Sequence, residues 1–143
     1  MKWITRKNVG IDRIACSWLI KKYIDNEAVF DFVDYDEESK DELSIQFDIP
    51  GCKYSHRRGR CSFSTLIKEY NLTDSILETI AKVIDGVDCV SDIVPSPESY
   101  GVEAICLGLR KHTGDDLQAI IQGEVIFDAL YAYLKEKQKN IFM

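Results

Sequence analysis

The stretch Ile11-Asp12-Arg13-Ile14-Ala15-Cys16-Ser17-Trp18-Leu19-Ile20 predicts the first helix of this 143-residue chain, and the fold assignment starts from it. Its apolar residues recur at the i, i+1, i+4 and i+5 positions of a helix with one buried face, namely Ile14, Ala15, Trp18 and Leu19. Asp12 stands where an N-cap is expected, and Asp25-Asn26 marks the predicted end.

Short segments rich in β-forming residues lie on both sides of this helix. Trp3-Ile4-Thr5 precedes it and Val29–Val33 follows it, and we expect both to be strands. Residues 43–49 alternate apolar and polar side chains, which is the period of a half-buried strand. Pro50-Gly51 signals a turn, so residues 52–56 are expected to return as a hairpin partner.

Four further helices are predicted downstream. Ser62 and Thr73 are candidate N-caps of the first two, and Ser96 followed by Pro97 begins the third. The fourth runs from about Asp115 into the lysines at 135–139, and Gly123 is a candidate interruption of it. One side of the third helix is small enough for close packing, through Gly101, Ala104, Ile105 and Gly108. These elements predict an α+β fold, predominantly helical with about five helices, and a small sheet of three or four short strands.

Length and composition fit a single domain spanning residues 1–143. The apolar fraction of 45% and the charged fraction of 29% are ordinary for a globular protein. No apolar run approaches the roughly 18 residues that a membrane helix needs, and the N-terminus has no signal-peptide pattern, so we expect a cytoplasmic location. The net charge of −6 argues against non-specific nucleic-acid binding, because phosphates would be repelled.

The five cysteines are odd in number and scattered, without a Cys-x-x-Cys pair. In a reducing cytoplasm they are expected to be thiols rather than a disulfide framework.

The loop His56-Arg57-Arg58-Gly59-Arg60-Cys61 carries the most unusual chemistry. Three arginines before a helix N-terminus attract anions, and their positive field is expected to lower the pKa of the Cys61 thiol. The alternative is that His56 and Cys61 are packing residues beside a solvated basic turn.

A second group of candidate residues begins the first helix. Asp12 and Cys16 lie at i and i+4, so they share a helix face, with Arg13 beside them. Together with His56 and Cys61 they provide the residue types of a mixed nitrogen, oxygen and sulfur metal site. The alternative is an N-cap at Asp12 with Ile11 and Cys16 forming a hydrophobic staple.

A pair of carboxylates, Asp115-Asp116, follows the third predicted helix. Such a pair can bind a metal ion or act as a general base, and it can also simply cap the next helix.

Several segments together resemble one family, the C-terminal domain of the chromate-resistance protein ChrB. The resemblance rests on residues 11–20, on Phe47-Asp48-Ile49-Pro50-Gly51, on Ser55-His56-Arg57 with Cys61-Ser62-Phe63, and on Asp115-Asp116 and Tyr131 towards the C-terminus. Ser17 stands where the family commonly has proline, and Ser64 stands where an acidic residue often occurs. The resemblance implies a role connected with chromate-responsive regulation. The half of ChrB associated with DNA binding is the N-terminal one, so we expect no direct nucleic-acid binding here.

Three hypotheses of function follow. The first is a chromate-resistance, stress-response domain that binds or senses a small oxyanion, chromate or sulfate, through Arg13, His56, Arg57 and Arg58, with catalytic thiol chemistry at Cys61. The second is a site or enzyme dependent on a divalent metal ion, with ligands among Asp12, Cys16, His56, Cys61, Asp115 and Asp116. The third is an interaction module, either a homodimer or a partner of a rhodanese-like or regulatory domain.

Overall fold

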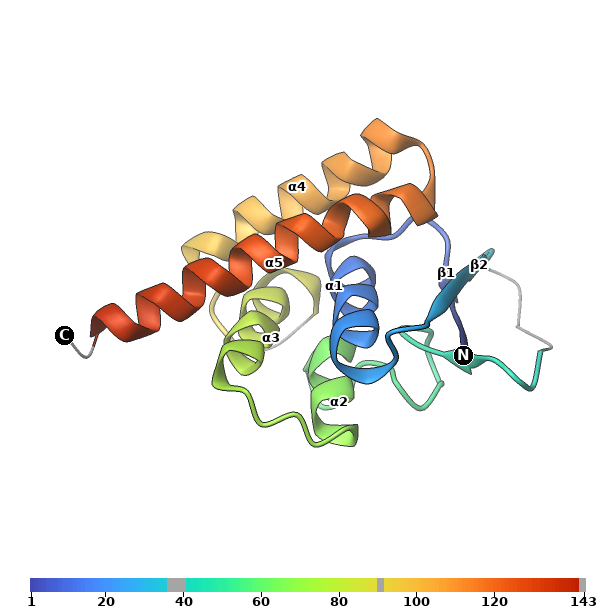
Figure 1. The fold of residues 1–143 in the computed structure, drawn as a ribbon, viewed down its shortest axis with the longest axis horizontal. Helices are drawn as coiled ribbons and strands as arrows, with labels where there is room; N and C mark the ends of the chain where they lie inside the picture. Colours follow the sequence, from blue (N-terminus) through green and yellow to red (C-terminus); the bar gives the residue numbers. More distant parts are fainter. Residues whose placement is uncertain (36–40, 90–91, 142–143) are drawn as a thin grey trace.

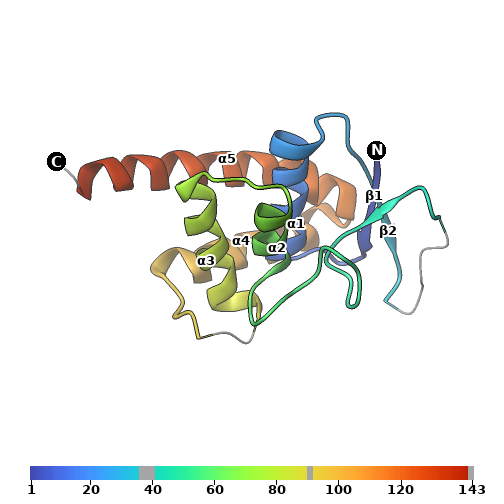
Figure 2. The ribbon, with the colours of Figure 1, turned by 90° about the horizontal axis from the view of Figure 1, so that it is seen from below.

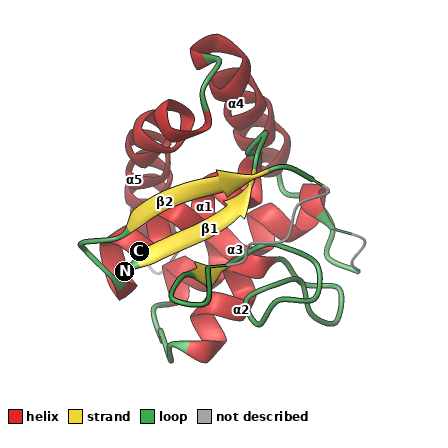
Figure 3. Ribbon diagram, turned by 90° about the vertical axis from the view of Figure 1, so that its right-hand side faces the viewer, coloured by secondary structure: helices red, strands yellow, loops and turns green. Residues whose placement is uncertain are grey.

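The computed structural model describes residues 1–35, 41–89 and 92–141, and the N-terminal third forms a parallel sheet with one helix between two of its strands (Figure 1). Strand β1 (Lys2–Arg6) is followed by helix α1 (Ile11–Leu19), a π-helical turn (Ile20–Ile24) and strand β2 (Val29–Val33). β1 pairs in parallel with β2 on one side and with the short β3 (Ile45–Gln46) on the other, giving the order β2-β1-β3 (Figure 3). As the middle strand, β1 buries Trp3, Ile4 and Thr5 almost completely.

The expected hairpin after β3 is wrong. Asp48 adopts a left-handed backbone conformation with φ of 50°, which turns the chain away after Phe47. Only an isolated parallel bridge joins Phe47 to Tyr54, through the Asp48 N–H and the Tyr54 carbonyl at 2.8 Å. Residues 52–56 therefore form a loop, and the strand alternation predicted for them does not apply.

The helical prediction is confirmed, with small shifts at the helix starts. The helices are α2 (Ser62–Glu69), α3 (Ser75–Asp88), α4 (Pro97–Thr113) and α5 (Asp116–Ile141). Cys61 and Asp74 are the N-caps of α2 and α3, each one residue from the predicted position. Ser96 caps α4 as predicted, with Ser99 completing a capping box. The α+β class, predominantly helical with five α-helices and a small sheet in the described part of the chain, matches the expectation.

Helix α1 occupies the middle of the helical layer and packs against α2, α3, α4 and α5 (Figures 1 and 2). Nearly all of its residues are buried, including Ile14, Cys16 and Leu19. Helix α5 passes across it without interruption at Gly123, and this glycine lies against Ile14 of α1. A Cβ atom at position 123 would lie 2.4 Å from Ile14 Cγ2.

The close-packing face predicted for α4 is wrong, because it faces solvent instead of another helix. Gly101, Ala104 and Gly108 are exposed and Ile105 is half-exposed, whereas Val102 and Cys106 face the core. Among the described residues, no helix combines the length and the apolar character that crossing a membrane requires.

Candidate metal centre

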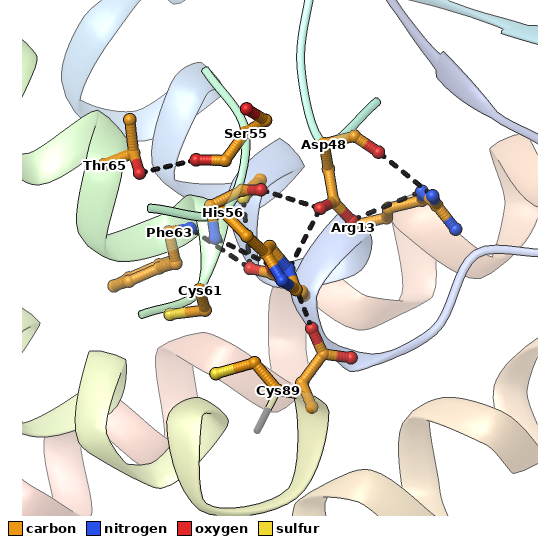
Figure 4. A network of polar contacts seen from close by, with 12 residues as sticks. Arg13, Asp48, Ser55, His56, Cys61, Phe63, Thr65 and Cys89 are labelled. Atoms are coloured by element: carbon orange, nitrogen blue, oxygen red, sulfur yellow. Dashed lines mark hydrogen bonds and ion pairs between the residues drawn. The ribbon is translucent and has the colours of Figure 1, made fainter. Parts of the chain in front are cut away.

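Four side chains that are distant in the sequence converge beside the N-terminus of α2 (Figure 4). The Nε2 atom of His56 lies 3.0 Å from Asp12 Oδ2, 3.3 Å from Asp48 Oδ1 and 3.3 Å from Asp88 Oδ2. Asp12 comes from the first turn of α1, Asp48 from the loop after β3, His56 from the loop before α2, and Asp88 from the last turn of α3. Helix packing and the turn after β3 thus bring three carboxylates to one imidazole.

Asp12 is buried, with 2% exposure, and is fixed by the backbone of α2. Its Oδ2 accepts the N–H of Ser62 at 2.9 Å, and its Oδ1 accepts the N–H of Phe63 at 3.1 Å. The first N–H groups of a helix lack partners within that helix, so Asp12 satisfies them from a neighbouring one. The predicted N-cap role of Asp12 on its own helix is therefore wrong, because α1 begins at Ile11 with Gly10 as N-cap.

Asp48 is held in place by two elements. Its Oδ1 accepts the hydroxyl of Ser62 at 2.6 Å, and its Oδ2 lies 3.3 Å from Nε of Arg13. Arg13 also donates to the Asp48 carbonyl at 3.0 Å. A non-glycine residue with positive φ costs free energy, and here that conformation places a carboxylate beside His56.

The electrostatics of the cluster favour positive charge at its centre. Hydrogen bonds that His56 donates to Asp12, Asp48 and Asp88 raise its pKa well above the usual value, so the imidazole is protonated at neutral pH. Burial and the nearby Asp48 raise the pKa of Asp12. The cluster therefore places three acidic side chains around one cation, and it disfavours an added anion.

The cluster opens to solvent through a cavity of about 430 Å³. Arg13, Asp48, Ser55, His56 and Asp88 line it together with residues 49–51. His56 is 39% exposed on its side chain, so a small ligand can reach the imidazole and the carboxylates from this side.

The cysteines do not join the cluster as ligands. Cys61 caps α2 with its backbone, and its thiol donates to the Ala81 carbonyl at 3.6 Å. Cys16 is equally buried and donates to Asp12 Oδ1 at 3.4 Å. Burial, with the charge of Asp12 nearby, raises the pKa of both thiols well above the usual value. The expected lowering of the Cys61 pKa is wrong, because burial and the nearby carboxylates of Asp12 and Asp85 raise it.

The predicted oxyanion ligands lie in two different pockets, with Arg13 and His56 in the cavity of about 430 Å³ and Arg57 and Arg58 in another. Arg13 is paired with Asp48, and Arg57 is paired with Glu69 at 2.7 Å. Arg58 lies at the tip of a turn and lines a different pocket from His56.

Of the carboxylate pair after α4, Asp116 has a structural role at the α4–α5 turn. Asp116 accepts the N–H of Val9 at 2.9 Å and is paired with Arg110 at 2.8 Å. Within the described ranges, Asp12, Asp48 and His56 form the group whose ligand atoms lie within 4.8 Å of one another, and neither Asp115 nor Asp116 belongs to it.

Asp48 and Asp88 belong to the cluster, although sequence reasoning did not select them as ligands. The alternation of residues 43–49 predicts a polar strand position for Asp48, not a ligand. Asp88 carries no local signal, because only the packing of α3 against α1 and α2 brings its side chain to His56.

With this geometry established, the comparisons with known proteins identify the family. A family model described as "ChrB, C-terminal domain" matches residues 3–134. The chain belongs to the ChrB C-terminal domain family. Protein ChrB of Cupriavidus metallidurans is 29% identical over 140 residues, which cover 97% of this chain and 42% of that relative. This ChrB-like chain therefore spans less than half the length of the relative, and no solved structure matches it.

Proposed function

We propose that this domain serves in chromate resistance and that its centre at Asp12, Asp48 and His56, with Asp88 beside the imidazole, binds a divalent metal cation. Membership of the ChrB C-terminal domain family supports the first part. One observation carries the second, namely that three carboxylates from three separate elements lie within 3.3 Å of a single imidazole nitrogen.

The separations within the cluster suit a metal ion. Metal–ligand bonds of about 2.1 Å place neighbouring ligand atoms roughly 3.0 Å apart in octahedral geometry and roughly 3.4 Å apart in tetrahedral geometry. The distances of 3.0 and 3.3 Å from His56 Nε2 to Asp12 and Asp48 fall in this interval, and the ligand atoms of these three residues all lie within 4.8 Å of one another. A cation at the centre would take over the positive charge that the protonated imidazole supplies, and binding would release the proton of His56.

The donor set favours a first-row divalent ion. Three carboxylates suit Mg²⁺, Ca²⁺ and Mn²⁺, whereas an imidazole suits Zn²⁺, Fe²⁺ and Ni²⁺. Mn²⁺ and Zn²⁺ accept both donor types, so they are the ions to test first. The buried thiols Cys16 and Cys61 lie behind the carboxylates and are not part of this proposal.

The geometry favours a cation over an oxyanion at this centre. Chromate or sulfate beside His56 would face Asp12, Asp48 and Asp88, while the guanidinium of Arg13 is already paired. The carboxylates would repel a dianion more strongly than the remaining positive charge attracts it. Recruitment of a rhodanese-like partner, a homodimer and a cytoplasmic location remain predictions.

The test is a calorimetric titration of chelator-treated, untagged protein with Mn²⁺ and Zn²⁺. We expect one ion per chain in the wild type and at least about 100-fold weaker binding in His56→Gln. His112→Gln is the matched control, because His112 is the second of two histidines and lies exposed on α4. The absence of stoichiometric binding, or an equal loss in both variants, would overturn the proposal.

A further inference from the structure

The outward side of helix α5 carries no charge over residues 117–134. This stretch contains two charged side chains, Glu124 and Asp128, and both are turned back towards the π-helical turn. Glu124 is paired with Lys21 at 3.5 Å, and Asp128 is paired with Lys22. A helix on the surface of a globular domain usually presents charged side chains to water, whereas α5 presents apolar or neutral ones. These exposed residues are Gln118, Ile121, Gln122, Val125, Ala129 and Ala132, of which Val125 is 69% exposed.

Helix α4 lies beside α5, and both lie on the same side of α1 (Figures 1 and 3). The outward side of α4 is flat, because Gly101, Ala104 and Gly108 are exposed there. A Cβ atom added at Gly101 or Gly108 would meet no described atom within 4 Å. Glycine inside a helix is less favourable than alanine, so packing within one chain does not explain these two residues.

Two contacts fix the register of the antiparallel helices α4 and α5. Leu109 Cδ1 lies 3.9 Å from the Cβ position of Gly123, and Lys137 donates to Glu98 at 3.1 Å near the other end. Both outward stripes are spaced by four and then three residues, so each follows one side of its helix. In this register three small residues of α4 are level with three residues of α5, namely Gly108 with Val125, Ala104 with Ala129, and Gly101 with Ala132.

We propose that the outer face of the α4–α5 hairpin, formed by these six residues, docks onto the same face of a second copy of the chain. The two-fold axis of this dimer runs parallel to the helices, so every residue keeps its height along them. It lays α5 of one copy antiparallel over α4 of the other, and the four helices form a bundle. Val125 then packs into the hollow at Gly108 of the second copy, and Ala132 packs onto Gly101.

A second copy fits this face because the face is complementary to itself. The protruding Val125 and the hollow at Gly108 are level within one chain, so a two-fold rotation places each protrusion on a hollow. The face is uncharged, so two copies bring no like charges together. Ile105 is half-exposed on the side of α4 that faces α5, because Leu109 lies four residues later on that side. Ile105 therefore lies near the axis and meets its own copy.

The area of the face is sufficient for a weak dimer. Helix α4 has 17 residues and is therefore about 25 Å long, and two helices side by side are about 20 Å wide. One face then covers roughly 500 Å² and the pair roughly 1,000 Å², which is the lower end of specific interfaces. We expect a Kd of about 10–100 μM for the dimer.

The test is sedimentation equilibrium of chelator-treated, untagged protein over a range of concentrations around this Kd. Val125→Glu places a charge in the interface and should weaken the dimer at least about 30-fold. Val94→Glu is the matched control, because Val94 is 82% exposed and lies outside the face, and it should dimerise like the wild type. Circular dichroism checks that both variants are folded.

Gly108→Leu separates the interface from the fold. The added side chain has open space in the monomer, so the stability to urea in dilute solution should be unchanged or higher. The same side chain fills the hollow that Val125 of the second copy needs, so the dimer should be at least about tenfold weaker. His56→Gln should dimerise like the wild type, because this inference does not depend on the metal centre.

Three results would overturn the proposal. The first is a wild type that stays monomeric at every concentration. The second is an equal loss of dimer in Val94→Glu and Val125→Glu. The third is concentration-dependent amide NMR shifts that map to a surface other than the outward sides of α4 and α5.

Discussion

The carboxylate of Asp12 in α1 accepts the backbone N–H of Ser62 at 2.9 Å and so caps α2 from a different helix. The same Oδ2 atom lies 3.0 Å from His56 Nε2. One buried side chain therefore joins the fold to the candidate site, because the position of α2 and the position of the imidazole depend on the same atom.

Asp12→Ala is expected to destabilise the metal-free protein by about 3 kcal/mol, because it removes an N-cap and leaves a buried network without its acceptor. Asp12→Asn keeps one acceptor oxygen and should cost about 1–2 kcal/mol. Urea denaturation in the presence of a chelator measures both. Asp115→Ala, an exposed aspartate beside α5, is the control and should change stability by less than about 0.5 kcal/mol. Equal effects at positions 12 and 115 would contradict the capping role.

The local elements were predictable from the sequence because their signals are local. The apolar spacing of residues 14–19 and the Ser96-Pro97 start each depend on a few neighbouring residues. The hairpin prediction failed at Asp48, because nothing in its immediate neighbours shows that an aspartate there adopts positive φ.

The candidate site was only partly predictable, because it depends on long-range packing. His56 and Asp12 were selected for their residue types, and the structure does place them in contact. Asp88 reaches them only because α3 packs beside α1 and α2, which no spacing along the chain reveals. The prediction for Cys61 failed for a related reason, since its burial among α2 and α3 outweighs the charge of the arginines next to it in the sequence.

The protonation of His56 should appear directly in the metal-free protein. Its pKa is raised by Asp12, Asp48 and Asp88, so its ring protons should keep the chemical shifts of an imidazolium from about pH 6 to pH 8, where an unperturbed histidine titrates near 6.5. A smaller step is expected near pH 7 from Asp12, whose pKa is raised to about 7. Proton NMR of the wild type and His112→Gln assigns the signal, because the chain has two histidines. A midpoint near 6.5 for His56 would contradict the three-carboxylate environment.

The raised pKa of His56 also predicts how the stability difference between wild type and His56→Gln depends on pH. The folded-state pKa lies above the unfolded one, so the stabilisation is fully present below about pH 6.5 and is lost as the pH rises towards the folded pKa. The change in the free energy of unfolding caused by His56 is at most about 1.4 kcal/mol per pH unit. The His56 side chain is 39% exposed, so solvent screening makes the change smaller than this bound. Urea unfolding of both proteins at pH 6 and pH 8 measures the change. A stability difference between wild type and His56→Gln that grows as the pH rises would contradict this prediction.

The thiols should react in the order of their exposure. Cys16 and Cys61 are fully buried and their pKa values are raised, whereas Cys52 and Cys89 are partly exposed. Iodoacetamide under native conditions should modify Cys16 and Cys61 at least about 100-fold more slowly than Cys52 or Cys89, because modification requires an opening of the fold. Mass spectrometry of peptides sampled over time gives the rates. Rapid alkylation of Cys61 would contradict this order and support the reactive thiol that the sequence predicted at this position.

Two glycine substitutions should change stability in opposite directions. Gly123→Ala places a methyl group 2.4 Å from Ile14 Cγ2, so α5 must move away from α1, at a cost of about 1–3 kcal/mol that exceeds the helix-propensity gain of about 1 kcal/mol. Gly108→Ala on α4 meets nothing within 4 Å and should stabilise the protein by about 0.5–1 kcal/mol. Thermal unfolding of both variants measures the contrast. Stabilisation by Gly123→Ala would mean that α1 and α5 are not in the close contact that brings this glycine against Ile14.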